Sequence, residues 1–231
     1  MTADPAPAPL GDRTTAELDA DGSQVLAVPL GSTEQHGPHL PLATDTLVAT
    51  ALVERLVRRR SDVVAAPALP YGSSGEHAGF AGTLSIGQHA LETVVVELVR
   101  SADRFAGTVL VCGHAGNAEP VARAVRTLRA EGRRVAAWVP VVPGGDAHAG
   151  RTETALVLAL HPELVRTHLA RPGATAPLPE VIDTLRTSGV AAVSPSGVLG
   201  DPTGATAEEG DALVERFVAE LDDLVQRLRT G

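Results

Sequence analysis

The chain has 231 residues, enough for about one domain, and 44% of them are apolar, so it can bury a core and is not expected to be disordered as a whole. A formal net charge of −9 argues against nucleic-acid binding, and the single cysteine excludes an internal disulfide framework and a metal site built from several thiolates. The start of the chain has neither the basic nor the apolar region of a signal peptide, and no run of ~18 apolar residues could span a bilayer. We therefore expect a cytoplasmic protein with a flexible Pro/Ala-rich tail over residues 1–20 and one domain over residues 21–231.

Strand-like and helix-like patterns alternate along the rest of the chain. In order, they predict a strand at 25–30, a helix at 46–60, a strand at 62–66, a helix spaced by apolar residues from Leu91 to Phe105, a strand at 108–112, a helix at 119–131, a strand at 134–142 and helices at 152–160 and 206–229. The Pro-, Gly- and Ser-rich segment 169–201 is expected to be irregular and to act as a wall or lid. This alternation predicts an α/β fold with three layers, α/β/α, around a mostly parallel central sheet.

Ionisable residues gather directly after three of the predicted strands. The first strand is followed by Glu34, His36 and Asp45, the third by His114, and the fourth by Asp146, His148 and Glu153. Because ligands bind at the carboxyl ends of the strands in such sheets, we expect these loops to meet on one rim.

Three carboxylates in one crevice repel one another unless cations neutralise them. Glu34, Asp45 and Glu153 together with the imidazoles of His36 and His114 match a two-metal hydrolytic site, in which Asp45 is a candidate bridging ligand. Oxygen and nitrogen donors without thiolate suit Zn²⁺, Fe²⁺ or Mn²⁺ and do not decide among them.

Simpler interpretations exist for each residue taken alone. Asp45 could be a helix N-cap, Glu153 could complement a helix dipole, and His114 could be a structural residue of a Gly-rich loop. No partner can be assigned to His39, His77 or His89, which points to surface or supporting roles. Cys112 is expected to be a small apolar side chain at the end of a buried strand. It lies beside the metal-binding loop but lacks a clear base, so covalent catalysis is the weaker interpretation.

Five segments resemble the signature segments of the creatininase family of metal-dependent amidohydrolases: PLGSTEQHGPHLP, YGSSGEHAGFAGTLSIG, GHAGN, PGGDAHAGRTET and GVAAVSPSGVLGDPTGATAEEG. The second, fourth and fifth of these are most similar to the mycofactocin-associated branch of that family. The resemblance covers residues 25–210 and implies a creatininase-like fold with two divalent ions per subunit. It also implies homo-oligomers and hydrolysis of an amide bond near the C-terminus of the mycofactocin precursor peptide, which releases a modified Val–Tyr dipeptide.

The same resemblance assigns roles to residues of this chain. It places Glu34, His36, Asp45 and His114 among the metal ligands, and it makes His148 the acid/base residue. Gly116 stands where creatinine-hydrolysing members have a further glutamate ligand, so Glu153 is expected to replace it as a ligand and to join His148 in catalysis.

Substrate recognition is expected in the loop that carries Tyr71, Glu76, His77 and Phe80, although Glu76 could equally be a surface charge. Creatinine or formamide hydrolysis remains an alternative activity, and a non-catalytic metal-binding module is an alternative of another class. Nucleotide binding is disfavoured because the loops contain neither GxGxxG nor a Walker-type GxxxxGK.

Overall fold

A parallel sheet organises the molecule, which we describe for residues 8–18 and 22–231 of a computed structural model. In that part of the chain four strands pair in the order β2-β1-β3-β4, with the bounds Val25–Leu30 (β1), Val63–Ala65 (β2), Gly107–Cys112 (β3) and Val135–Trp138 (β4). All three pairings are parallel, and nearly every strand residue is buried. A sheet covered on both faces explains why the strands read as continuous apolar runs.

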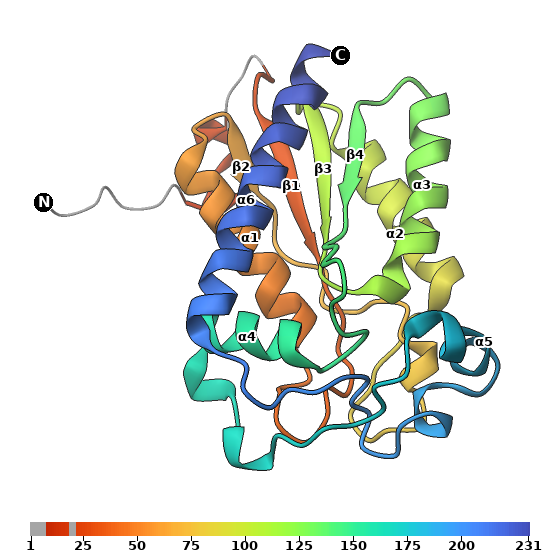
Figure 1. The fold of residues 1–231 in the computed structure, drawn as a ribbon. Helices are drawn as coiled ribbons and strands as arrows, with labels where there is room; N and C mark the ends of the chain where they lie inside the picture. The colour runs from red at the N-terminus through yellow and green to blue at the C-terminus, as the bar shows by residue number, and fades with distance from the viewer. Residues whose placement is uncertain (1–7, 19–21) are drawn as a thin grey trace, which may run out of the picture.

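Helices cover both faces of this sheet (Figure 1). Helices α1 (Thr44–Arg59), α4 (Arg151–Leu160) and α6 (Ala207–Thr230) lie on one face, and α2 (Gly87–Ser101) and α3 (Ala118–Ala130) lie on the other. Alternate strand residues enter the two cores: Val25 and Val109 pack under α1 and α6, whereas Leu26 and Leu110 pack under α2 and α3. The predicted three-layer α/β/α architecture is confirmed.

Two predicted boundaries are wrong. Strand β4 ends at Trp138 rather than at residue 142, because Pro140 has no N–H to donate to a ladder and the chain leaves the sheet before it. Helix α2 ends at Ser101, so Ala102 and Phe105 follow the helix instead of continuing it. Both still pack against the core beneath α2, which explains why their spacing looked helical.

The segment 169–201 is less irregular than its composition suggested. It contains helix α5 (Leu178–Ser188) and the 3-10 helix η7 (Val190–Ala192). Proline in the first turn of a helix is tolerated because the N–H groups there have no partner within the helix, so Pro179 does not interrupt α5. Leu185 of α5 packs with Val190 and Leu199 in a third, smaller core.

Short 3-10 helices complete the described chain: η1 (Leu10–Asp12), η2 (Thr15–Glu17), η3 (Gly75–His77), η4 (Ala115–Asn117), η5 (Pro162–Leu164) and η6 (Thr167–Leu169). Leu10 packs against the core beneath α2. Residues 1–7 and 19–20 of the predicted tail, and residue 21, lie outside the described residues, and the division into tail and single domain stays a prediction. Within the described residues, none of the helices is long and apolar enough to cross a bilayer.

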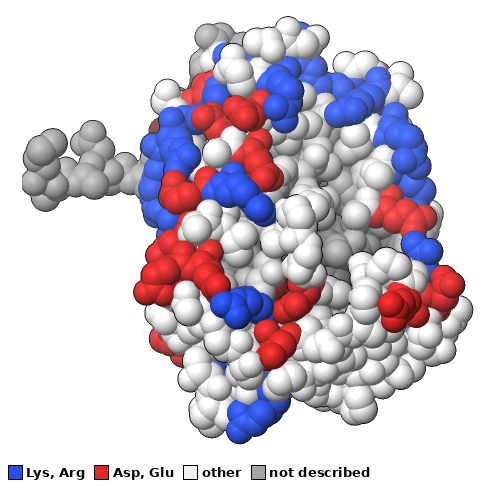
Figure 2. All heavy atoms as spheres, in the orientation of Figure 1, with Lys and Arg blue, Asp and Glu red and all other residues white. Residues whose placement is uncertain are grey.

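Acidic and basic side chains are interspersed over the face formed by α1 and α6 (Figure 2). Glu215 of α6 pairs with Arg55 and Arg59 of α1, and Asp222 of α6 bonds Arg60, which follows α1, at 2.7 Å. The acidic excess of the chain is therefore not gathered into one field on this face.

Phe217 of α6 is the largest fully buried side chain and stacks edge-on against Trp138 with ring centroids 5.1 Å apart. Replacing Phe217 with alanine is expected to lower the free energy of unfolding by about 3–5 kcal/mol, because apolar area is lost and a cavity remains. Urea titration of the metal-free variants measures this. Val141→Ala, at a side chain 69% exposed, is the control and should change it by less than about 0.5 kcal/mol.

Candidate metal centre

The predicted site residues meet at the carboxyl end of the sheet. Glu34 and His36 lie in the loop after β1, and Asp45 lies in the first turn of α1 that follows it. His114 follows β3, and Glu153 lies in the first turn of α4. Each loop begins where a neighbouring parallel strand ends, so the strand order itself brings these segments together.

Asp45 lies at the centre of the cluster and is 2% exposed. Its Oδ1 is 3.2 Å from His36 Nε2, and its Oδ2 is 3.4 Å from His114 Nδ1 and accepts a hydrogen bond from Ser32 Oγ at 2.5 Å. Ala43 is the N-cap of α1 and makes no side-chain cap bond, so the N-cap interpretation of Asp45 is wrong. The two oxygens face two different imidazoles, which is the arrangement a bridging carboxylate needs.

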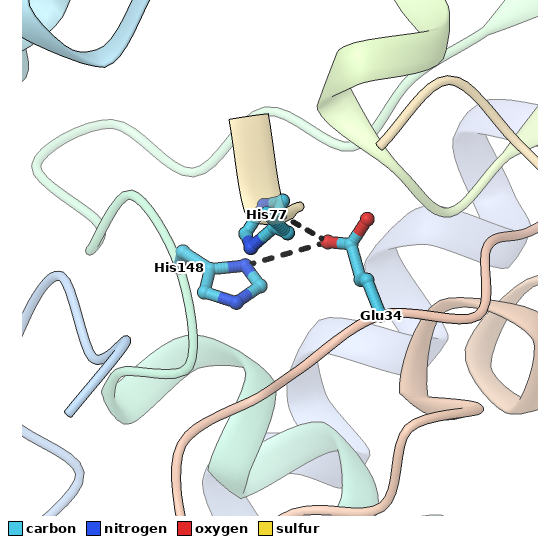
Figure 3. Close-up of side chains that lie close together, drawn as sticks. All are labelled: Glu34, His77 and His148. Carbon is cyan, nitrogen blue, oxygen red and sulfur yellow. Dashed lines mark ion pairs between the residues drawn. The ribbon is translucent and has the colours of Figure 1, made fainter. Parts of the chain in front are cut away.

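Glu34 is fully buried, and neither of its oxygens has a hydrogen-bond partner among the described residues. Oε2 lies 3.2 Å from His114 Nε2, while Oε1 lies 3.3 Å from His77 Nε2 and 3.8 Å from His148 Nδ1 (Figure 3). An unpaired buried carboxylate is strongly unfavourable. A divalent cation would supply the missing partner, so the residues present fit a metal ion.

Glu153 both complements the start of α4 and faces the imidazoles of the cluster. Its Oε2 accepts the Ala149 N–H at 2.5 Å at the start of α4, as a first-turn acid should, and it lies 3.8 Å from His36 Nε2 and 4.0 Å from His148 Nδ1. Ala149 has a φ of +51°, a strained conformation for a residue with a Cβ. Ala149 lies in the chain between His148 and the start of α4, and its N–H bonds Glu153 there.

Among the described residues, three sets of side chains could each hold an ion, with ligand atoms within 4.8 Å of one another: Glu34, Asp45 and His114; His36, His148 and Glu153; Glu34, His77 and His148. All five residues predicted as metal ligands fall within the first two sets. His148, predicted as an acid/base residue, also lies within reach of an ion.

Burial and charge perturb the protonation of the two acids that a first ion would contact. Burial raises the pKa of Glu34 to about 7, and the charge of Asp45 adds to the effect. Burial also acts to raise the pKa of Asp45, but the charge and hydrogen bond of His36 and the charge of His114 outweigh it and hold that pKa well below its usual range. Since a ligand carboxylate must be ionised, binding of an ion here is expected to release a proton from Glu34.

The imidazoles of the cluster divide into two with a raised pKa, His36 and His114, and others with a lowered pKa. Burial opposes the charge of His114, but Glu34 and Asp45 outweigh it and raise its pKa. Burial opposes the charge of His36, but Asp45 prevails and raises its pKa to about 10. Burial lowers the pKa of His148 well below its usual range, and the charge of His36 lowers it further. Burial raises the pKa of Glu153. The metal-free site thus holds protons that cations would displace.

Only part of the loop predicted to bind substrate lies at the cluster. His77 is buried in the cluster, and Glu76 Oε1 lies 3.6 Å from His114 Nε2 at its edge. Tyr71 is 44% exposed, and Phe80 packs against the small core of Leu185, Val190 and Leu199.

Sequence reasoning left some neighbours of the site without an assignment. Of the surface and supporting roles left open, His39 takes a buried position with its Nε2 2.9 Å from Thr154 Oγ1, whereas His89 is exposed. Ser32 and Gln35 were not singled out, although both contact site residues. The position of Gln35 between two candidate ligands in the sequence was the available signal.

Gly116 keeps the space beside His114 open. A Cβ on Gly116 would lie 2.4 Å from His114 Nε2, 2.5 Å from Glu76 Oε1 and 2.6 Å from the Ser73 carbonyl oxygen. Because the backbone carbonyl cannot move aside cheaply, Gly116→Ala is expected to weaken metal binding about 10–100-fold, the effect of disturbing the groups that orient a ligand. Competition with a chelator measures this, and Gly75→Ala, whose Cβ would meet nothing within 4 Å, should bind metal normally.

Comparisons with known proteins agree with this geometry. The creatininase family model, described as creatinine amidohydrolase, matches residues 12–225. The chain is 50% identical over 230 residues to the mycofactocin precursor peptide peptidase of Mycobacterium tuberculosis, covering 95% of this chain and 90% of that protein. It is 30% identical to the creatinine amidohydrolase of Pseudomonas putida, covering 94% and 95% of the two chains.

Solved structures show the same fold. A crystal structure of creatinine amidohydrolase (creatininase) superposes with a TM-score of 0.79 at 28% identity, over 96% of this chain and 98% of that one. Two further creatininase structures, one described as Zn-Zn type and one as Mn, also have TM-scores of 0.79, at 27% and 28% identity, each over 96% of this chain and 98% of the other. From the sequence match, the shared fold and the cluster of acids and imidazoles, the chain belongs to the creatininase family of hydrolases.

Proposed function

We propose that this chain is a metal-dependent peptidase that hydrolyses an amide bond near the C-terminus of the mycofactocin precursor peptide and releases the modified Val–Tyr dipeptide. The observation that carries the proposal is the 50% identity, over 95% of the chain, to a relative named for that activity. The buried cluster of carboxylates and imidazoles supports the metal dependence.

Two divalent ions per subunit, Zn²⁺, Fe²⁺ or Mn²⁺, fit the donors in kind and number. Glu34, Asp45 and His114 would hold one ion, and His36, Asp45 and Glu153 would hold the other. When bound, such ions make a water molecule acidic enough to attack near neutral pH and polarise the amide carbonyl. The unpartnered oxygens of Glu34 and the two-sided contacts of Asp45 support this division.

The chain's own residues handle the proton and the peptide. His148, neutral and buried, is proposed to take a proton at Nδ1 and to deliver it to the leaving amine, with Glu153 beside it. Glu76 is partly exposed at the edge of the cluster, where it could meet a peptide N–H or amine. Recognition by Tyr71 and Phe80, a homo-oligomeric assembly and a cytoplasmic location stay predictions.

Incubation of metal-loaded protein with the modified precursor peptide, creatinine and formamide in parallel, followed by mass spectrometry, tests the substrate. We expect a dipeptide only from the first. Turnover of creatinine alone would replace the peptide proposal with the activity of the Pseudomonas putida relative. Elemental analysis of anaerobically purified protein identifies the metal, because ferrous iron is easily lost in air.

A further inference from the structure

Gln35 lies between the candidate ligands Glu34 and His36 and is 5% exposed. Two backbone groups determine which way its side-chain amide points. Oε1 accepts a hydrogen bond from the Gly37 N–H at 2.8 Å, and Nε2 donates to the Gly197 carbonyl oxygen at 3.2 Å. A backbone N–H can only donate and a carbonyl can only accept, so the reverse orientation of the amide would lose both bonds.

The amide in turn determines which nitrogen of His77 carries the hydrogen. Gln35 Nε2 lies 2.9 Å from His77 Nδ1, and because the amide nitrogen can only donate, Nδ1 must be the acceptor. In the neutral ring the hydrogen is then on Nε2, which faces Glu34 Oε1 at 3.3 Å (Figure 3). Because Nδ1 accepts the hydrogen bond from Gln35, the ring carries a single hydrogen and is neutral.

A different group of the same residue acts on His148. The backbone carbonyl oxygen of Gln35 lies 2.8 Å from His148 Nε2, so Nε2 carries the hydrogen and Nδ1 keeps its lone pair. Gln35 Nε2 is also 3.1 Å from that ring nitrogen, but its two hydrogens are already directed at His77 and Gly197. The free Nδ1 faces Glu34 Oε1 and Glu153 Oε2.

We propose that Gln35 is a positioning residue that sets the tautomers of both rings: its side chain makes His77 carry its hydrogen on Nε2, the nitrogen that faces Glu34, and its backbone carbonyl makes His148 present the Nδ1 lone pair to the carboxylates. One consequence concerns the third donor set. Because His77 offers Glu34 a hydrogen instead of a lone pair, Glu34, His77 and His148 do not form an additional ion site. Of the two rings that face Glu34 Oε1 in this set, only His148 is then available as a base or ligand. For its effect on rate, the proposal rests on the proposed function.

Gly197 also helps to hold the Gln35 amide in its orientation. It has a φ of +80°, and a Cβ on it would lie 1.9 Å from Gln35 Oε1. Gly197→Ala would therefore push the amide away from the orientation that His77 requires, without altering Gln35 itself. Gly132, with a φ of +81° and nothing within 4 Å of its Cβ, offers a matched control for the backbone strain.

Nitrogen-15 NMR of histidine-labelled protein tests the proposal without any substrate, in the metal-free and Zn²⁺-loaded forms. In the wild-type protein we expect both His77 and His148 to carry hydrogen on Nε2, with signals assigned through His77→Gln and His148→Gln. A wild-type His77 with hydrogen on Nδ1 would overturn the proposal without the need for a variant. A wrong substrate would leave this result untouched, so the two failures are distinguishable.

Gln35→Glu separates the two halves of the proposal. A carboxylate accepts where the amide donated, so the His77 hydrogen should move to Nδ1, whereas His148 should keep its hydrogen on Nε2 because its partner is a backbone carbonyl. Zn²⁺ affinity, measured by chelator competition, should fall about 10–100-fold. An unchanged His77 signal contradicts the proposal. If Gln35→Glu does not fold, Gly197→Ala must show a disturbed His77 tautomer while Gly132→Ala keeps the wild-type one.

Discussion

Replacing Glu34 with alanine is expected to remove bound metal and to abolish hydrolysis. Among the described residues, Glu34 is the one cluster acid with no exposed surface and no hydrogen bond to either oxygen. Both oxygens are therefore free to bind an ion. Loss of an ion removes several kcal/mol of charge stabilisation, which lowers the rate by about three orders of magnitude or more. Elemental analysis and dipeptide release measured by mass spectrometry are the two readouts.

Glu54→Ala is the matched control, because Glu54 is a carboxylate on α1 whose side chain is 56% exposed. It should keep full metal content and full rate. Turnover by metal-stripped Glu34→Ala at the wild-type rate would mean that the cluster does not perform the hydrolysis.

Without metal, the same carboxylate should destabilise the fold. Burial raises the pKa of Glu34 from 4.5 to about 7, so the folded state holds a proton that the unfolded state releases. Stability from this group is present below pH 4.5 and is lost as the pH rises to 7, by about 3 kcal/mol. Metal-free Glu34→Gln should therefore be more stable than wild type at pH 7.5 and similar to it at pH 4.5. Urea unfolding at both pH values gives the difference, and an equal difference at both would contradict the pKa shift.

Replacing His148 with alanine should lower the rate about 10²–10⁴-fold while the metal content stays unchanged. The physical reason is that its Nδ1 lone pair faces the cluster, where a proton must pass to the leaving amine, while the ligands proposed for both ions remain. Single-turnover kinetics and elemental analysis, performed on the same preparation, measure the two quantities.

The competing outcome for His148 is equally specific. His36, His148 and Glu153 lie close enough together to share an ion. Loss of one metal equivalent in His148→Ala would therefore make this ring a ligand and leave the proton to another group. His89→Ala, at an exposed position in the first turn of α2, should change neither rate nor metal content.

The parts of the site that sequence could predict are those placed by strand order. Glu34 and His114 follow neighbouring strands of the parallel sheet, and Glu153 lies in the first turn of the helix after the next strand. The alternating strand and helix patterns were therefore enough to bring these residues together. Asp45 was ambiguous, because an acid at the start of a helix has the same local sequence whether it caps the helix or faces His36. Only the tertiary positions of His36 and His114 decide between the two.

His77 could not be placed from sequence because no strand directly precedes it. It lies on η3, in the long connection between β2 and α2, and that connection is held by non-local contacts such as the Thr33–Leu84 bridge. Helix α5 was missed because of its prolines. They suggested a loop, whereas they lie at or before the first turn of the helix, where a helix accepts them.

The single cysteine has a consequence for measuring stability. Cys112 is fully buried at the end of β3, and burial raises the pKa of its thiol to about 12. Alkylating reagents attack thiolates, so native protein should resist them until the central sheet opens. The rate of modification under native conditions would report that opening directly, with no engineered probe and no competing thiol in the chain.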